Sequence, residues 1–251
     1  MLTFLLYFLV GVSVPQAMVE DSSCEEANHI WQRLLNEQPT HIQTHYTEQA
    51  ITLTGKGRQI STAEERLQYL APLLSPQQTV QSIEPVFCEL ANPNTDIRYD
   101  LSRIKPAVGP DYIQLVIWRE ANGQYLRELD FLAPLAPGRT DLTALDRARD
   151  KWIELCNEHD ATILVEQLYE PEALYYNHRP MIVGREQITK TYSYMNNEDY
   201  SLHLSPLVVQ PVRKDLVLEI GQCSGSYGGK YILIWRRNAE GQWQIWMDSN
   251  V

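Results

Sequence analysis

Residues 218–250 read LEIGQCSGSYGGKYILIWRRNAEGQWQIWMDSN and contain the clearest secondary-structure pattern of the chain. Two runs rich in aromatic and branched residues flank the polar turn N-A-E-G, residues 238–241. This arrangement is typical of a long β-hairpin. The earlier turn S-G-S-Y-G-G, residues 224–229, lies between two strands rather than before a helix, so it predicts a β-turn and not a phosphate loop.

The first half of the chain repeats the second half in the same order. Trp118, Tyr125 and Asp130 occupy the positions that Trp235, Trp243 and Asp248 occupy around the final hairpin. Further matched pairs are Trp31 and Trp152, Asn36 and Asn157, Tyr46 and Tyr169, Ala50 and Ala173, Ile60 and Ile182, Glu65 and Glu186, and Pro85 and Pro206. Because this period is much longer than a solenoid unit, it predicts two copies of one whole domain.

Each copy shows helices followed by four long strands. In the first copy we expect helices at 25–36 and 41–49, a strand at 51–53, a helix capped by Thr62, and strands at 80–90, 96–104, 111–119 and 124–132. In the second we expect helices at 147–157, 161–169 and 184–195, and strands at 172–177, 201–211, 215–224, 229–237 and 242–248. The predicted domains are 24–133 and 146–251, and the proline-containing segment 134–145 is the linker.

Residues 152–250 resemble the SnoaL-like branch of the nuclear transport factor 2-like (NTF2-like, cystatin-like fold) superfamily. The resemblance lies in A-L-Y-Y-N (173–177), V-G-R-E-Q-I (183–188) and the final hairpin, and the first half resembles the same fold more weakly. It implies an α+β fold: two tandem cone-shaped domains, each a curved antiparallel sheet wrapped on about three helices, with a pocket open at one end. Members include polyketide cyclases, ketosteroid isomerase-like enzymes, dehydratases and proteins that only bind or dimerise, so the fold sets no function.

The net charge of −11 argues against nucleic acid and against anionic lipid as partners, since both attract basic proteins. The apolar run at residues 2–12 is too short to span a bilayer and is followed by Ser13, Pro15 and Ala17. Residues 1–17 therefore read as a signal peptide, which predicts a secreted or periplasmic protein with no membrane contact beyond export. An uncleaved anchor is the alternative.

The four cysteines are Cys24, Cys88, Cys156 and Cys223, two in each half. Four cysteines allow three pairings, and the sequence does not choose among them. One bridge in each half, Cys24 with Cys88 and Cys156 with Cys223, is one interpretation. Four buried free thiols are the other.

Asp248 is the first candidate for chemistry. If it faces the pocket together with Trp246, desolvation raises its pKa toward the range of a general base. Family enzymes with a pocket carboxylate move a proton next to a carbonyl, which is the role the resemblance would transfer to Asp248. A structural aspartate is the alternative, and Asp130 at the matching position of the first half favours it.

Histidines provide weaker candidates. His178 follows a predicted strand and could act as acid or base at the pocket mouth, although an exposed loop histidine is the favoured interpretation. His41 and His45 are four apart on a predicted helix, which allows a metal pair but favours a solvated helix face. We expect neither a metal nor a cofactor.

The second half is rich in aromatic residues, and a pocket lined by several of them suits a flat apolar ligand. The predicted ligand-binding residues are Tyr176, Tyr192, Tyr194, Trp235 and Trp246. The favoured function is binding of a small apolar or aromatic molecule in the second-domain pocket. The alternatives are a lyase or isomerase of the ketosteroid isomerase or polyketide cyclase type that uses Asp248 and His178, and a dimerisation scaffold, either as a homodimer or by pairing of the two domains within one chain.

Overall fold

The computed structural model describes residues 22–75, 78–136, 138–177 and 179–251. The predicted signal peptide at 1–17 and the candidate His178 therefore lie outside the described residues. None of the described helices is long and apolar enough to cross a membrane.

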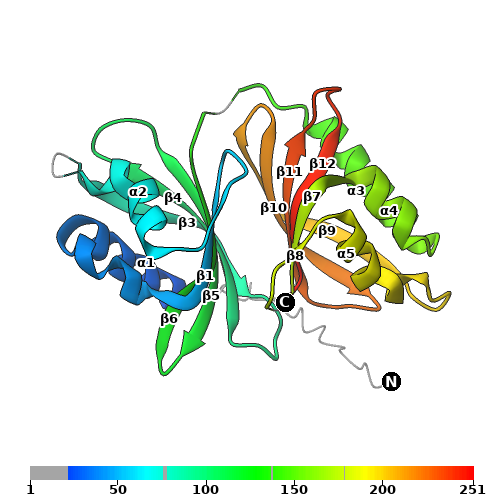
Figure 1. Cartoon of the computed structure of the whole chain (residues 1–251), viewed down its shortest axis with the longest axis horizontal. Coiled ribbons are helices and arrows are strands. Elements are labelled where there is room, and N and C mark those ends of the chain that lie inside the picture. The colour runs from blue at the N-terminus through cyan, green and yellow to red at the C-terminus, as the bar shows by residue number, and fades with distance from the viewer. Residues whose placement is uncertain (1–21, 76–77, 137, 178) are drawn as a thin grey trace, which may run out of the picture.

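The chain forms two six-stranded sheets with the same topology (Figure 1). The first has the order β2-β1-β6-β5-β4-β3, built from β1 (Tyr46–Thr54), β2 (Gln59–Ile60), β3 (Val80–Leu90), β4 (Ile97–Pro106), β5 (Tyr112–Ala121) and β6 (Gln124–Pro134). The second has the order β8-β7-β12-β11-β10-β9, built from β7 (Tyr169–Tyr176), β8 (Ile182–Val183), β9 (Leu202–Arg213), β10 (Leu216–Gly225), β11 (Lys230–Arg237) and β12 (Trp243–Ser249). In each sheet one pair is parallel, β1 with β6 and β7 with β12, and every other pair is antiparallel.

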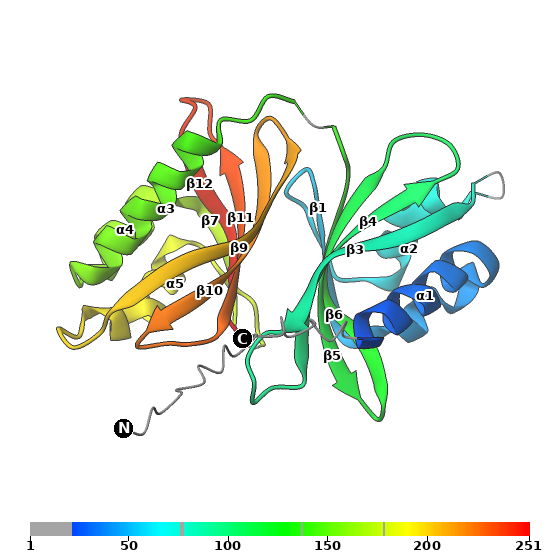
Figure 2. The same cartoon turned by 180° about the vertical axis from the view of Figure 1, so that it is seen from behind.

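The helices cover the outer face of each sheet (Figures 1 and 2). The first half contains α1 (Ser22–Glu37), the 3-10 helix η1 (Pro39–His45) and α2 (Ala63–Leu74). The second contains α3 (Leu142–Asn157), α4 (Ala161–Leu168), α5 (Arg185–Thr191) and the 3-10 helix η2 (Tyr192–Asn196). The α+β class and the tandem duplication predicted from the sequence are confirmed.

Trp118 and Trp235 occupy equivalent places, which is the strictest test of the duplication. Trp118 pairs with Arg127 across the β5–β6 hairpin, and a register shift separates it from Ile117. Trp235 pairs with Ile245 across β11–β12, and the same shift separates it from Ile234. Both copies thus contain a β-bulge at the same point, where one strand has an extra residue.

One predicted helix differs from the structure in both type and length. The segment predicted as a helix at 41–49 is the 3-10 helix η1, which ends at His45, and strand β1 then begins at Tyr46. The sequence Y-T-E-Q-A-I-T-L-T pairs with β6, a strand about 80 residues away, and this long-range pairing overrides the local helical signal. The predicted cap of α2 is confirmed, because the Thr62 hydroxyl accepts a hydrogen bond from the Glu65 amide at 3.3 Å.

The two sheets face each other across the middle of the molecule (Figure 1). Residues from the inner faces of both sheets pack into one buried apolar cluster. The first sheet contributes Leu53, Ala91, Ile97, Tyr99, Leu101, Ile113, Leu115, Ile117, Leu129, Phe131 and Ala133. The second contributes Leu174, Tyr176, Val212, Leu216, Leu218, Ile220, Ile232, Ile234, Trp246 and Met247. The inner faces of the two sheets are therefore buried within the chain.

The cysteines are bonded in the first half and free in the second. Cys24 and Cys88 form a disulfide that joins α1 to β3, which confirms one of the two bridges considered. The second bridge is wrong, because Cys156 and Cys223 are free, buried thiols. The Cys156 thiol lies instead against the Met195 sulfur at 3.9 Å, and burial raises the pKa of both thiols to about 12. These groups behave as small apolar side chains in the helix–sheet core.

Candidate functional site

The bulge in β12 decides which side chains meet in the second domain. Trp243 and Ile245 pack toward the helices, whereas Trp246 and Met247 both belong to the cluster between the sheets. Asp248 then returns to the helix side, where it lines an internal cavity. Asp248 and Trp246 therefore lie on opposite faces of the sheet, and the strict alternation that would place them in one pocket is wrong at this point because the bulge inserts a residue.

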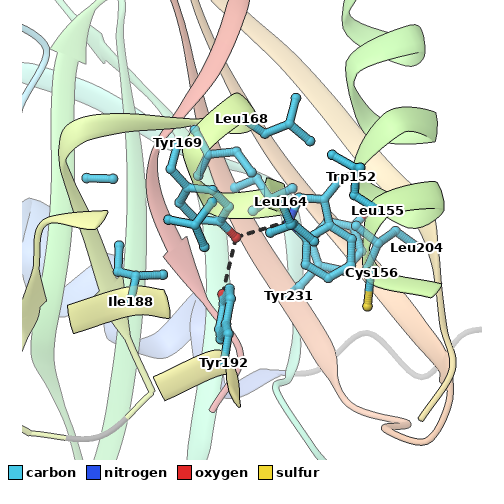
Figure 3. Packing of buried hydrophobic residues seen from close by; sticks show 14 of the residues in the cluster. Trp152, Leu155, Cys156, Leu164, Leu168, Tyr169, Ile188, Tyr192, Leu204 and Tyr231 are labelled. Carbon is cyan, nitrogen blue, oxygen red and sulfur yellow. Dashed lines mark hydrogen bonds between the residues drawn. The ribbon is translucent and has the colours of Figure 1, made fainter. Parts of the chain in front are cut away.

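Asp248 is held by two tyrosine hydroxyls. Tyr169 donates a hydrogen bond to Asp248 Oδ2 at 2.6 Å, and Tyr192 donates to the same oxygen. Trp152 in turn donates from Nε1 to the Tyr169 hydroxyl at 3.0 Å, and the two tyrosine oxygens are 3.2 Å apart. Figure 3 shows Tyr169 between Trp152, which belongs to α3, and Tyr192, which belongs to η2.

Burial sets the ionisation of this group. It raises the pKa of Asp248 from its ordinary value of 3.8 to about 6, against the opposing effect of the two tyrosine hydrogen bonds. The pKa values of Tyr169 and Tyr192 are raised well above 10, first by burial and then by the Asp248 charge. At neutral pH the site is thus one carboxylate with two neutral hydroxyl donors, and such charge-assisted hydrogen bonds are strong and directional.

The interior around Asp248 is almost completely filled. Its cavity measures about 20 Å³, which is room for about one water molecule. It is lined by Trp152, Tyr192, Met195, Leu202, Leu204, Cys223, Tyr231, Leu233, Asp248 and Asn250. The hollow interior expected from the resemblance is therefore occupied by aromatic and aliphatic side chains.

A much larger cleft of about 740 Å³ lies at the mouth of the same domain. Its lining comprises Tyr175, Asn177, Arg179, Pro180, Ile182, Thr191, Tyr194, Tyr200, Ser226, Tyr227 and Asn250. Asn250 belongs to both the cleft and the small cavity, so the floor of the cleft adjoins the Asp248 site. The Tyr175 hydroxyl donates to Asn250 Oδ1 at 2.6 Å and holds this floor in place.

Ring contacts connect the cleft to Asp248. The Tyr192 ring lies edge-on to Tyr175, with centroids 5.0 Å apart, and edge-on to Tyr194 at 6.2 Å. Tyr194 in turn meets Tyr200 at 5.2 Å. Tyr194 is 43% exposed, so an apolar ring is presented to solvent at the cleft. The edge-to-face geometry is the one that aromatic pairs prefer.

The five predicted ligand-binding residues do not form one site. Tyr192 contacts Asp248, and Tyr194 lines the cleft beside it. Trp235 is buried and donates from Nε1 to Glu219 Oε2 at 3.1 Å. Tyr176 and Trp246 belong to the cluster between the sheets.

Sequence reasoning did not assign a site role to Tyr169, Tyr175, Tyr200 or Asn250. One signal was present in the repeat. Tyr46 donates to Asp130 Oδ2 at 2.9 Å, as Tyr169 does to Asp248, so the two matched residue pairs are also matched contacts. Two residues that recur together in both copies thus indicated a Tyr–Asp contact.

The first domain fills the equivalent space with an arginine. Arg127 occupies the position of Ile245 and donates from Nε to Asp130 Oδ2 at 3.2 Å. Its guanidinium lies 4.2 Å from the Trp31 ring centroid and 5.0 Å from that of Trp118. A buried guanidinium between aromatic faces is a stable arrangement, and it occupies the interior of this domain.

The two histidines of the first domain do not share a solvated face. His41 is exposed, but His45 is buried, stacked on Trp31 at 5.8 Å and edge-on to Trp118 at 5.3 Å. Burial, followed by the Arg127 charge, lowers the pKa of His45 to about 3, so it is neutral. The expected solvated face is wrong for His45, because the short helix η1 turns its last residue into the core. Among the described residues, no three His, Cys, Asp or Glu side chains are grouped as metal ligands.

No family model matches the chain, and no curated protein matches it. Several solved structures, however, are similar to parts of the chain. An NTF2-like protein of unknown function from Shewanella oneidensis matches with a TM-score of 0.39 and 11% identity, over 43% of this chain and 96% of its own. A putative scytalone dehydratase from Novosphingobium aromaticivorans matches with a TM-score of 0.37 and 16% identity, over 43% of this chain and 80% of its own.

A ketosteroid isomerase-like protein from Erwinia carotovora atroseptica matches with a TM-score of 0.36 and 14% identity, over 43% of this chain and 92% of its own. The element order and the strand order described above recur in both sheets. Each half is thus similar in fold to these NTF2-like structures. Identities this low concern the fold alone, so the function of this chain has to be argued from its own residues.

Proposed function

We propose that the second domain binds a small, flat, largely apolar molecule in the tyrosine-lined cleft at its mouth. The observation that carries the proposal is the cleft itself. Its volume of about 740 Å³ lies within the usual range of ligand sites, about 300–1,000 Å³. Four tyrosines line it, and their rings supply apolar area with few rotatable bonds to immobilise.

The filled interior supports a binding site in the cleft rather than at the centre of the cone. A cavity of about 20 Å³ has no space for an organic molecule, whereas the cleft above it does. Asp248 then influences the cleft indirectly. Its carboxylate holds the Tyr192 hydroxyl, and the Tyr192 ring in turn packs against Tyr175 and Tyr194 of the cleft. In this interpretation Asp248 is a positioning residue.

Fluorescence titration with 2-naphthol as the probe tests the proposal. Tyr194→Ala removes an exposed ring of the cleft, and we expect the Kd for 2-naphthol to rise about tenfold, the equivalent of about 1.4 kcal/mol. Tyr125→Ala is the matched control, since Tyr125 lines a separate groove of about 560 Å³ in the first domain. The proposal fails if Tyr194→Ala leaves the Kd unchanged, or if the control weakens binding equally.

A second function, proton transfer by Asp248, is favoured by one specific observation. A pKa of about 6 leaves the group ionised yet basic near neutral pH, as a general base requires. The reaction would need a substrate carbon to reach the small cavity beside Asp248. Deuterium exchange of a carbonyl compound with an acidic α-proton, such as 2-tetralone, tests this function: wild-type chain should accelerate exchange and Asp248→Asn should not.

A further inference from the structure

From the contacts across the sheet–sheet junction, we infer that the first domain is a frame that positions two walls of the second-domain cleft. This inference rests on the proposed function. The positioning residues are Thr47 and Gln49 of β1, which hold Arg179, and Tyr99 of β4, which holds the C-terminal residues after β12. None of these three residues lines the cleft.

Arg179 is the first wall. It lines the cleft from the segment between β7 and β8, yet its guanidinium is bound by the other domain. Nη2 donates to Thr47 Oγ1 at 2.6 Å and Nη1 donates to Gln49 Oε1 at 3.1 Å. Glu128, on β6 of the first domain, adds an ion pair, with 3.7 Å between Arg179 Nε and Glu128 Oε1.

Glu128 also contacts other residues of both domains at the junction between the sheets. It is buried, and it accepts hydrogen bonds from Arg119 of its own domain and from the Tyr176 hydroxyl at the end of β7. Glu128 occupies the bulge position that Trp246 occupies in the second domain. The same bulge thus presents a carboxylate to the junction in one copy and an indole in the other, which makes the two copies unequal at this surface.

The second wall is formed by Asn250, the residue near the end of the chain that makes the floor of the cleft. The buried Tyr99 hydroxyl accepts a hydrogen bond from the Val251 amide at 2.9 Å and lies 3.4 Å from Ser249 Oγ. Asn250 lies between these two residues and forms the floor shared by the cleft and the Asp248 cavity. A first-domain side chain therefore holds the residues on both sides of this floor.

The consequence for binding follows from preorganisation. A wall that is already fixed does not have to be ordered when the ligand arrives, so fixing it strengthens binding without any new ligand contact. Short connecting segments at a surface are normally the least ordered parts of a domain. The first domain adds hydrogen bonds to the guanidinium of Arg179 beyond the contacts that the second domain itself makes with this segment.

The test uses a double variant of the full chain, Thr47→Val with Gln49→Ala. Thr47 is half-buried and Gln49 is exposed, so the fold should tolerate both changes. We expect the Kd for 2-naphthol to rise about threefold to tenfold, because the Arg179 wall must then be ordered on binding. Arg213→Ala is the control: it removes another cross-junction hydrogen bond, to the Gly55 carbonyl, at the opposite end of β9 from Tyr200.

Non-additivity separates positioning from a general loss of structure. Arg179→Ala should weaken binding at least as much, and adding it to the double variant should weaken binding no further than Arg179→Ala alone, because both act through one guanidinium. Additive losses, or an unchanged Kd in the double variant while Tyr194→Ala still weakens binding, would overturn the frame. If Tyr194→Ala also binds 2-naphthol normally, the cleft proposal itself fails.

Discussion

Replacing Asp248 with asparagine should stabilise the chain at neutral pH and not at acid pH. The buried carboxyl has a pKa of about 6 in the folded chain and an ordinary value of 3.8. Between these values the folded chain binds more protons at this group than the unfolded chain does. The contribution of Asp248 to stability therefore falls as the pH rises from about 4 to about 6, and it stays low above that window.

The size of the effect follows from the shift. A difference of about two pKa units corresponds to about 3 kcal/mol, at roughly 1.36 kcal/mol per unit. Asparagine carries no charge at any pH, but its amide oxygen can still accept from Tyr169 and Tyr192. The difference in free energy of unfolding between Asp248→Asn and wild type should thus grow by about 3 kcal/mol from pH 4 to pH 7.

Urea unfolding followed by near-ultraviolet circular dichroism at a series of pH values measures this difference. Asp130→Asn is the matched control in the first domain, because Asp130 receives the same tyrosine contact but also pairs with the buried Arg127. Neutralising it leaves a buried guanidinium without its counterion, so this variant should be destabilised by about 3–5 kcal/mol at pH 7. At pH 7, Asp248→Asn should therefore raise the free energy of unfolding, whereas Asp130→Asn should lower it.

A difference between Asp248→Asn and wild type that stays constant from pH 4 to pH 7 would refute the reasoning. It would mean that the Asp248 carboxyl titrates equally in the folded and unfolded chains. Loss of stability in both variants at pH 7 would also refute the reasoning, since the charge of Asp248 would then stabilise the fold, as we expect for Asp130, instead of destabilising it.

Two further predictions concern stability. Reducing the Cys24–Cys88 disulfide, which spans 64 residues, should lower the free energy of unfolding of the first domain by about 4 kcal/mol, measured by urea unfolding with and without a phosphine reductant. Arg149→Ala should cost about 3–5 kcal/mol, because it leaves the fully buried Glu219 carboxylate without its two-bond partner. Asn28→Ala, at the equivalent helix position, removes a neutral donor and should cost about 1 kcal/mol.

The second domain provides the control for the disulfide prediction. Cys156→Ala with Cys223→Ala should leave the response to reductant unchanged, because both thiols are free. In the unreduced wild type, two thiols should react with Ellman's reagent in urea and none should react in its absence. Four reactive thiols in urea, or none, would contradict the pairing.

Much of the fold could be predicted because its signals are local. The strand runs predicted at 80–90 and 229–237 and the N-A-E-G turn each depend on neighbouring residues, and the observed strands lie within a few residues of the predicted bounds. The Trp118 and Trp235 match is also local, since each lies a few residues before a turn. The helix expected at 41–49 was wrong because β1 gains its hydrogen bonds from β6, far along the chain.

The candidate site was predicted less well, because facing directions depend on a single residue. Strict alternation would place Trp246 and Asp248 on one face, but the bulge beside Trp235 places them on opposite faces. One inserted residue reverses every facing direction after it. The interior that should have been hollow is filled because Tyr169 and Tyr192, from different elements, meet on one oxygen of Asp248.

The linear order of residues was thus enough to establish the duplication, the α+β class and most strands, since these follow from spacing along the backbone. It was not enough to establish that the two sheets pack on each other, that Arg127 fills one cone, or that Arg179 reaches across to Thr47. Each of these joins groups that are distant in the chain. Such contacts form only where packing of the whole molecule brings the groups together, and spacing alone does not contain that information.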